Sequence, residues 1–165
     1  MRNSESDTIT ALGGAVAGDR SVQLSWSAPA DGGSPLTGYK LYRATTSGNE
    51  TLVATLGTAT AYTDSGLTNG TTYYYKLSAS NAAGDSTLSN EVSAIPATTP
   101  TAPTWKPTSV GNGTVTLNWN PPTDNGGAAI TGYKLYRATT SGNQTLLTTL
   151  GATTSWTDTN LTNGT

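Results

Sequence analysis

The chain has 165 residues, of which 34% are hydrophobic and 11% are charged, and its formal net charge at pH 7 is −2. Because its basic residues are few and scattered, it offers no basic stripe for a phosphate backbone and no cationic amphipathic helix for a bilayer, so we expect no nucleic-acid binding and no membrane insertion. The chain has no cysteine and no histidine, which excludes disulfides, thiolate nucleophiles and the commonest general base and metal ligand.

The first part of the chain has the two-residue hydrophobic period of β-strands. Residues 8–16 predict an edge strand. Val22, Leu24 and Trp26 then alternate with polar residues, which predicts a strand with one buried and one solvated face. Residues 29–33 are rich in Pro, Gly and Asp and indicate a loop.

Residues 38–49 predict the next strand and the turn that ends it. Tyr39 and Leu41 point to one face of this strand, and Lys40 and Tyr42 to the other.

Further short strands follow at 52–56, around Tyr62, at 71–80 and at 90–95, with a loop at 81–86. The strand at 71–80 has the clearest alternation of apolar and polar residues in the chain. Seven strands at regular spacing, with no helical period, predict an all-β fold in which two antiparallel sheets pack as a sandwich.

The sequence of residues 38–49 is repeated without change at 132–143, which indicates two copies of one structural unit. The second copy stops before its equivalents of the sixth and seventh strands. We therefore expect a fragment of a longer protein, unless another chain donates the missing strands. The predicted organisation is a complete domain at 1–97, a Pro/Thr linker at 98–103 and a partial domain with the first five strands at 104–165.

The linker region is rich in proline. Pro96 to Pro103 contains three prolines, which favour an extended, semi-rigid spacer. Trp105, just beyond it, is expected either to pack against the end of the first unit or to be half-exposed.

Several short motifs occur together in residues 8–96 and resemble a fibronectin type III domain, of the kind common in bacterial extracellular multidomain proteins. These motifs are Leu24-Ser25-Trp26 with Pro29, the strand 38–42, the segment 67–73, Asn81 with Gly84, and residues 89–92. The resemblance implies tandem immunoglobulin-like sandwiches, the second without its last two strands. It also implies an extracellular or cell-surface location, although the polar start of this chain has no signal peptide.

The resemblance also implies which residues form the core and the corner of the fold. Trp26 would be a buried anchor bridging the two sheets, and Tyr73 would form a tyrosine corner, its hydroxyl bonding backbone near Leu67. The expected core and corner residues are Trp26, Tyr39, Leu67, Tyr73, Trp119 and Tyr133.

No catalytic constellation, metal site or cofactor site is visible in the sequence. Asp31 and Asp124 lie in equivalent loops, and Asp64 and Asp158 lie near equivalent strand ends, where Asp usually serves turn chemistry. One Asp per loop provides too few ligands for calcium. We therefore expect no enzymatic activity.

The best candidate binding face is formed by Lys40, Tyr42, Tyr74 and Lys76. Aromatic rings beside ammonium groups suit stacking on a sugar or contact with a protein partner. The alternative is that these residues are ordinary cross-strand pairs that shield the sheet, and we favour this alternative.

The leading functional hypothesis is a structural spacer and presentation module whose partners are neighbouring domains of the same polypeptide. The second hypothesis is an adhesion module that binds a polysaccharide or a surface protein. The third is an accessory piece of a secreted polysaccharide hydrolase.

Overall fold

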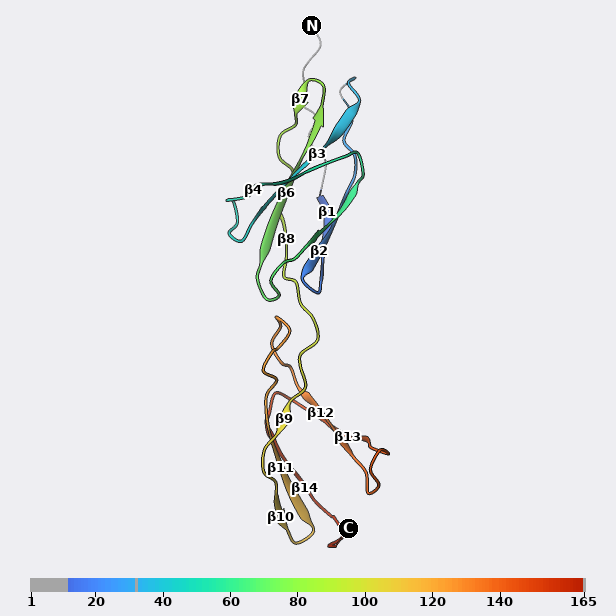
Figure 1. The fold of residues 1–165 in the computed structure, drawn as a ribbon, viewed down its shortest axis with the longest axis vertical. Helices are drawn as coiled ribbons and strands as arrows, with labels where there is room; N and C mark the ends of the chain where they lie inside the picture. The colour runs from blue at the N-terminus through green and yellow to red at the C-terminus, as the bar shows by residue number, and fades with distance from the viewer. Residues whose placement is uncertain (1–11, 32, 165) are drawn as a thin grey trace. The chain divides into compact units, whose positions relative to one another are not determined.

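The computed structural model describes residues 12–31 and 33–164, so the start of the predicted strand at 8–16 lies outside the described residues. The described part is built from strands, and it contains no helix that is long and apolar enough to cross a membrane. The chain divides into two compact units, Met1–Thr98 and Thr99–Thr165 (Figure 1).

The first unit contains two antiparallel sheets, as the sequence predicts. One sheet has three strands in the order β1-β2-β5. The other has five strands, in the order β4-β3-β6-β7 with β8 also paired to β6. The strands are β1 (Leu12–Gly18), β2 (Ser21–Trp26), β3 (Leu36–Ala44), β4 (Thr51–Leu56), β5 (Ala61–Ser65), β6 (Tyr73–Asn81), β7 (Gly84–Asp85) and β8 (Val92–Ala94).

The core of the first unit lies between these sheets. Trp26 on β2 meets Tyr39 on β3 edge to face, with ring centroids 5.3 Å apart. Both residues are buried, as are the inward residues of β6, among them Tyr75 and Leu77. The predicted alternation on β3 and β6 thus produces one continuous apolar layer that links the two sheets.

The predicted loop at 81–86 is only partly a loop, because it contains the short strand β7. Ser80 pairs with Asp85 and Asn81 pairs with Gly84. The Asn81 side chain accepts a hydrogen bond from Ala83 N at 2.8 Å, and Gly84 has a positive φ of 136°. An Asn that caps its own turn and a Gly free of Cβ strain allow a hairpin here, and strand spacing alone did not reveal it.

A hydrogen bond to a tyrosine hydroxyl holds the segment that leads into β6. Thr68 N–H donates to the Tyr73 hydroxyl at 3.1 Å, close to the position that the resemblance implies. Leu67 is buried beside this bond, and Gly70 completes the turn with a φ of 81°.

The second unit contains a four-stranded sheet, β10-β11-β14 with β9 also paired to β11, and a separate pair, β12-β13. Pro107 interrupts the edge strand that is continuous in the first unit, because proline cannot donate to the ladder. The strands are β9 (Thr104–Trp105), β10 (Ser109–Gly111), β11 (Thr114–Asn120), β12 (Tyr133–Arg137), β13 (Thr145–Leu150) and β14 (Ser155–Asp158).

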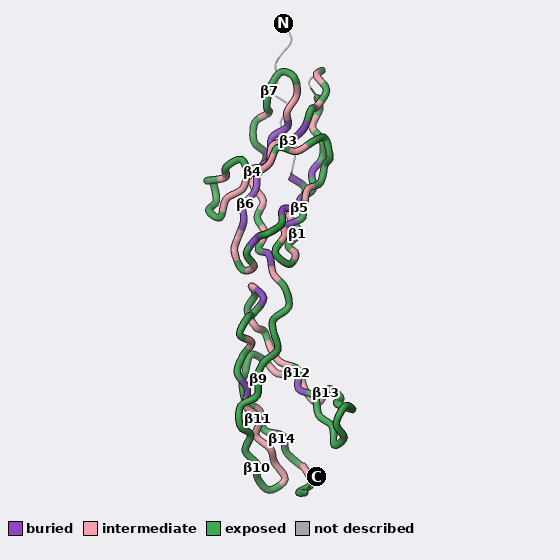
Figure 2. The backbone as a smooth tube through the Cα atoms, in the orientation of Figure 1, coloured by how far each residue is buried: buried purple, intermediate pink, exposed green. Residues whose placement is uncertain are grey.

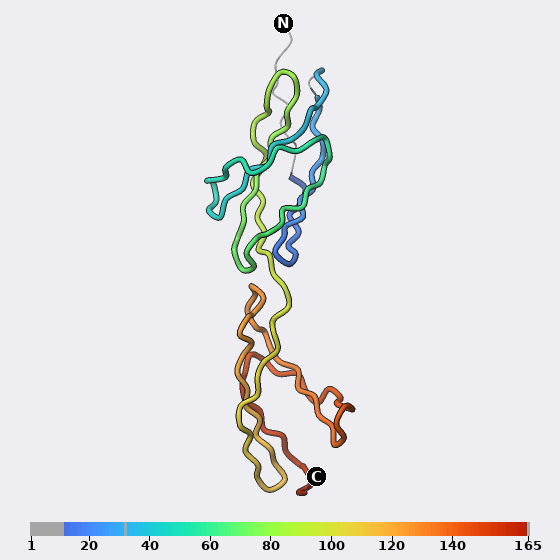
Figure 3. Tube along the Cα trace, in the orientation of Figure 1, coloured from blue at the N-terminus to red at the C-terminus, as the bar shows by residue number. Residues whose placement is uncertain are grey.

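The two units differ in how much they bury. Among the described hydrophobic residues of the second unit, Trp119 and Leu135 are buried, whereas the first unit contains a whole cluster. Tyr133 is half-buried, although its counterpart Tyr39 is 1% exposed. Figure 2 shows this contrast along the chain, which Figure 3 traces. The cause is that β3 lies between β4 and β6, while β12 pairs with β13 alone among the described strands.

One glycine in the repeated segment is required by close packing. A Cβ on Gly38 would collide with the carbonyl oxygen of Leu56, and a Cβ on Gly132 would collide with that of Leu150. Both collisions involve backbone, which cannot move aside cheaply. The repeat therefore keeps Gly at this position in both copies.

We predict that Tyr73→Phe lowers the free energy of unfolding of the first unit by about 1 kcal/mol, the usual size of one lost buried hydrogen bond. Urea denaturation measures the change. Tyr74→Phe is the matched control, because the Tyr74 hydroxyl makes no hydrogen bond within the described residues. Equal midpoints for Tyr73→Phe and the unmutated chain would refute the tyrosine corner.

We also predict that residues 1–97 alone melt cooperatively and that residues 104–165 alone do not. Each large side chain left uncovered forgoes roughly 1.5–3 kcal/mol, and a few such losses equal a domain's whole stability of about 5–15 kcal/mol. Differential scanning calorimetry of the two segments measures this. A sharp calorimetric peak for the second segment would contradict the prediction.

Candidate functional site

The candidate face suggested by the sequence lies on the solvent side of the sheet formed by β4, β3 and β6. Tyr42 lies opposite Lys76 across the β3–β6 pair, and Lys40 lies opposite Ser78. Tyr74 lies further along β6, opposite Ala44. Lys40, Tyr42, Tyr74 and Lys76 are all half-buried, and this register places them next to one another on one face of the sheet.

Both lysines of this face form ion pairs with carboxylates. Lys40 Nζ forms an ion pair with Asp85 on β7, and the pKa of Lys40 is raised chiefly by this hydrogen bond. Lys76 Nζ lies 2.9 Å from Glu50 and 3.4 Å from Glu91. Ion pairing with carboxylates makes these ammonium groups less available to a ligand. This arrangement corresponds to cross-strand pairing.

Glu50 and Glu91 tie the turn after β3 to the segment before β8. Gly48 N–H lies 3.1 Å from an oxygen of each carboxylate, and the Ser47 hydroxyl donates to Glu91 at 2.7 Å. The hydrogen bond with Glu91, together with that from Lys76, outweighs burial and lowers the pKa of Glu50 to about 2. The Glu50 side chain is 2% exposed, although residues 45–49 of the turn are themselves exposed.

A buried ion pair behind this sheet corrects the expectation for Asp64 and Asp158. Both residues are buried, and each side chain is bound by an arginine of another strand instead of by a turn. Arg43 Nη1 donates to both carboxylate oxygens of Asp64, at 2.9 and 2.7 Å, and the Tyr75 hydroxyl donates to Asp64 at 3.0 Å. Burial, followed by the Asp64 charge, raises the pKa of the Tyr75 phenol.

The second unit repeats the ion pair without the tyrosine. Arg137 Nη1 lies 3.0 and 2.8 Å from the two oxygens of Asp158. Sequence reasoning missed both pairs. The available signal was that Arg and Asp recur together in both copies, at 43 and 64 and again at 137 and 158.

The acidic loops are turn structures in the described residues. Gly33 N–H donates to the Asp31 side chain at 2.9 Å, and Gly126 N–H donates to the Asp124 side chain at 2.8 Å. Within the part of the chain that the structure describes, no three acidic side chains converge in a way that could hold a metal ion. Asp31 and Asp124 thus hold the turns of their own loops.

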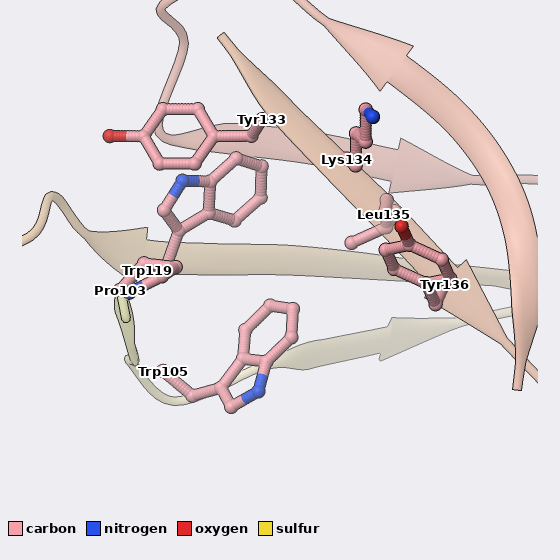
Figure 4. Close-up of a pocket in the computed structure, with 7 residues that line it drawn as sticks. All are labelled: Pro103, Trp105, Trp119, Tyr133, Lys134, Leu135 and Tyr136. Atoms are coloured by element: carbon pink, nitrogen blue, oxygen red, sulfur yellow. The ribbon is translucent and has the colours of Figure 1, made fainter. Parts of the chain in front are cut away.

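An aromatic groove opens on the second unit, beside β12 (Figure 4). Trp105, Trp119 and Tyr133 stack in sequence, edge to face, with centroid separations of 5.9 and 5.4 Å. The Trp105 indole is 63% exposed. The remaining lining residues are Pro103, Lys134, Leu135 and Tyr136.

Sequence reasoning did not assign Trp105 to this groove. In the early part of the repeat the two copies are offset by 93 residues, as Trp26 and Trp119 show, and this offset matches Trp105 to Leu12. Leu12 pairs with Trp26 just as Trp105 pairs with Trp119, but Leu12 is 3% exposed.

Comparison with known proteins gives a family match over the first unit. The sequence profile of the fibronectin type III domain matches residues 9–95. A solved structure, the sixth fibronectin type III domain of human fibronectin type III domain containing protein 3, superposes with a TM-score of 0.52 at 23% identity. That superposition covers 62% of this chain and 97% of the human domain, and it supports the fold alone.

Two curated relatives are bacterial enzymes that, by name, degrade polysaccharides. Exoglucanase B of Cellulomonas fimi is 36% identical over 153 residues, which is 86% of this chain and 13% of the relative. Chitinase A1 of Niallia circulans is 36% identical over 151 residues, which is 83% of this chain and 20% of the relative. The chain therefore spans a fifth or less of the length of these relatives.

We predict that Glu50→Gln flattens the acid limb of the stability curve of the first unit. The folded-state pKa of about 2 lies below the ordinary Glu value of about 4.3. The stabilisation is therefore present above about pH 4.3 and is lost as the pH falls toward 2. Gln144 is the matching residue of the second copy, so the variant keeps a side chain that the repeat already uses.

Urea midpoints between pH 2 and pH 7 measure the effect, because the two chains should converge at the acid end and differ most above about pH 4.5. A constant difference at every pH would contradict the assignment.

Proposed function

Because the chain belongs to the fibronectin type III family, we propose that it is a non-catalytic spacer and presentation module of a larger, extracellular multidomain protein. Domains of this family are generally non-catalytic. The observation that carries the proposal is the way in which the ends of the linker are held by the units on either side. A spacer needs a well-packed body and a short connection, and the core of the first unit and the short linker support this role.

The linker region is anchored at both ends. Gly70 N–H donates to Pro96 O at 2.8 Å and Ala97 N–H donates to Gly18 O at 3.1 Å, which ties its start to the first unit. Thr101 N–H donates to Asp124 O at 2.9 Å, which ties its end to the second unit. Residues 98–100 lie between these anchors. A connection this short and proline-rich favours a limited range of movement over a floppy tether.

The surface of the first unit also supports a role without chemistry. A hydrolase site of the paired-carboxylate type requires two acids held across a cleft. Here Glu50 and Glu91 share Lys76, and Asp85 is paired with Lys40. The acids of this face are therefore engaged in holding strands and turns together.

The relatives favour one setting for the spacer, that of an accessory region in a polysaccharide-degrading enzyme. A polymer such as chitin is degraded outside the cell, which is consistent with an extracellular location. In this setting the partners are neighbouring domains of the same polypeptide. We assign residues 1–97 as the complete domain, 98–103 as the linker and 104–165 as the partial domain.

The competing function is a carbohydrate-binding or surface-binding module. The half-buried rings of Tyr42 and Tyr74 are the features of the first unit that favour it, because aromatic rings stack on sugars. Their lysine neighbours are already paired with acids, so these ammonium groups are engaged within the sheet. The spacer is therefore the better-supported function.

We predict that the full chain has the same mobility in affinity gels containing cellulose derivatives or soluble chitin as in gels without polymer. An unrelated β-sandwich of similar size and charge provides the mobility reference. Retardation by a polymer would contradict a pure spacer. In that event Tyr42→Ser and Tyr74→Ser, compared with Trp105→Leu, identify which aromatic surface binds.

A further inference from the structure

The chain contains a short acceptor motif that the spacer function does not use. Asn-x-Thr, the acceptor sequence for N-linked glycosylation, occurs at Asn49, Asn69, Asn112, Asn143, Asn160 and Asn163. In a threonine-rich chain some of these copies arise by chance. The structure distinguishes them, because an acceptor asparagine needs a carboxamide that is exposed and free of competing hydrogen bonds.

Asn49 and Asn143 meet this requirement, one in each unit. Each is exposed and follows the turn between two paired strands, β3 and β4 in the first unit and β12 and β13 in the second. Asn49 N–H closes its turn by donating to Thr46 O at 3.3 Å, and Asn143 N–H donates to Thr140 O at 3.3 Å. Neither carboxamide makes a hydrogen bond within the described residues. The nitrogen that would react is therefore available in both units.

The threonine of the motif is accessible at the same two places. Thr51 begins β4 and Thr145 begins β13, and both are exposed, with hydroxyls that make no hydrogen bond in the part of the chain that the structure describes. The middle residue differs between the copies, Glu50 in the first and Gln144 in the second. The two units therefore keep the asparagine and the threonine while the residue between them varies.

Asn69 and Asn163 also match between the copies, but their carboxamides are engaged. Asn69 Nδ2 donates to Asp19 at 2.8 Å, and Asn69 Oδ1 accepts from Arg20 N–H at 2.8 Å. Asn163 Nδ2 donates to the Asn112 side chain at 2.7 Å, and this hydrogen bond engages two of the motifs at once. These asparagines hold neighbouring turns together, and the nitrogen of Asn69 or Asn163 already donates.

The backbone at Asn160 is also fixed. Its φ of 59° lies in the left-handed region, and the N–H of the next residue, Leu161, donates to Gly113 O at 2.9 Å. Both features would have to change before this segment could extend into the site of a transferring enzyme. Among the described residues, the folded chain thus presents the motif in accessible form at Asn49 and Asn143.

The two accessible motifs lie at the start of open sheet edges. β4 is the last strand of its sheet although β3 has a neighbour on each side, and β13 pairs with β12 alone among the described strands. Neither strand contains a charged residue or a proline, and Leu52, Val53 and Leu146 are 51%, 42% and 53% exposed. Apart from one bulge in each pairing, these edges lack the features that prevent another chain from adding a strand.

We propose that Asn49 and Asn143 are acceptors for an N-linked oligosaccharide that shields these edges. The co-substrate is a glycosyl donor activated by a phosphate or diphosphate leaving group. The carboxamide nitrogen forms a bond to the anomeric carbon, the bond from that carbon to the leaving oxygen breaks with its electron pair, and one amide proton passes to a base of the transferring enzyme. A bulky, hydrated group two residues before each edge strand hinders pairing with another chain.

This inference rests on the extracellular location in the proposed function, because the motif is used in secreted proteins. The two proposals fail separately. Retardation in a polymer gel would contradict the spacer without affecting the acceptor sites, and a lack of glycosyl transfer would remove the acceptor sites without affecting the spacer.

The first test incubates the folded full chain with a lipid-linked oligosaccharide and a purified oligosaccharyltransferase that accepts short peptides carrying each motif. Peptide mass spectrometry then locates the modified residues. We expect transfer to Asn49 and Asn143, and transfer to Asn69 that is slower by on the order of tenfold or more relative to its peptide, because two hydrogen bonds must open first. No transfer to Asn49 and Asn143, or equal transfer to Asn69 in the chain and in its peptide, would overturn the assignment.

Substitutions of the threonine provide the matched controls. Thr51→Val removes the hydroxyl at nearly constant volume and should abolish transfer to Asn49 while transfer to Asn143 continues. Thr51→Ser keeps a hydroxyl and should retain transfer to Asn49. Continued transfer to Asn49 in the Thr51→Val chain would show that the reaction does not use the motif, and would contradict the proposal.

The second test measures the shielding of the edges. Sedimentation velocity compares the full chain before and after glycosylation, and we expect self-association of the unmodified chain at high concentration and its loss after modification. The unmodified chain carrying Leu52→Lys and Leu146→Lys is the control, because a lysine on an edge strand blocks strand addition without a glycan. Equal sedimentation of the modified and unmodified chains, or self-association that persists with both lysines, would overturn the shielding role.

Discussion

The pairing of β3 with β6 is the interaction on which the rest of the first unit depends. It places β3 in the interior of a five-stranded sheet, and it brings the inward face of β6 over the Trp26–Tyr39 contact. The second unit serves as an internal control, because β12 has the same sequence and local geometry but lacks this neighbour among the described strands. The contrast in burial between Tyr39 and Tyr133 therefore measures what one strand pairing contributes, independent of local sequence.

The Arg–Asp pair shows how local pairing and sandwich closure are related. Both copies form the pair with nearly the same distances, so it does not require β6. The Arg–Asp pair joins β3 to β5 in the first unit and β12 to β14 in the second. It therefore connects the two sheets of each unit, including the second unit, whose core is less covered. Removing one partner would leave an uncompensated buried charge, which is costly. In the first unit Tyr75 adds a third group to this network, and the same residue contributes to the core.

Much of the fold could be predicted from the sequence, because two-residue alternation identifies strands such as β2 and β6 directly, and the repeat reveals the tandem organisation. The resemblance added the tyrosine corner.

The hairpin strand β7 was missed because two residues are too short to show a period. Asp64 was misinterpreted because its partners, Arg43 and Tyr75, come from other strands, and only the folded sheet brings them together. The acids that neutralise Lys40 and Lys76 were missed for the same reason. Trp105 could have been assigned by aligning the two copies residue by residue.

Hydrogen exchange of the backbone amides in residues 39–43 and 133–137 tests the central claim most directly. The two segments and their neighbours have the same sequence, so their intrinsic exchange rates are the same, and any difference reports structure. Under native conditions we expect the amides of β3 to be protected up to the level of global unfolding of the first unit. The amides of β12 that face its free edge should exchange orders of magnitude faster. Equal protection of the two strands would show that β6 is not what stabilises this sheet, and would contradict the account.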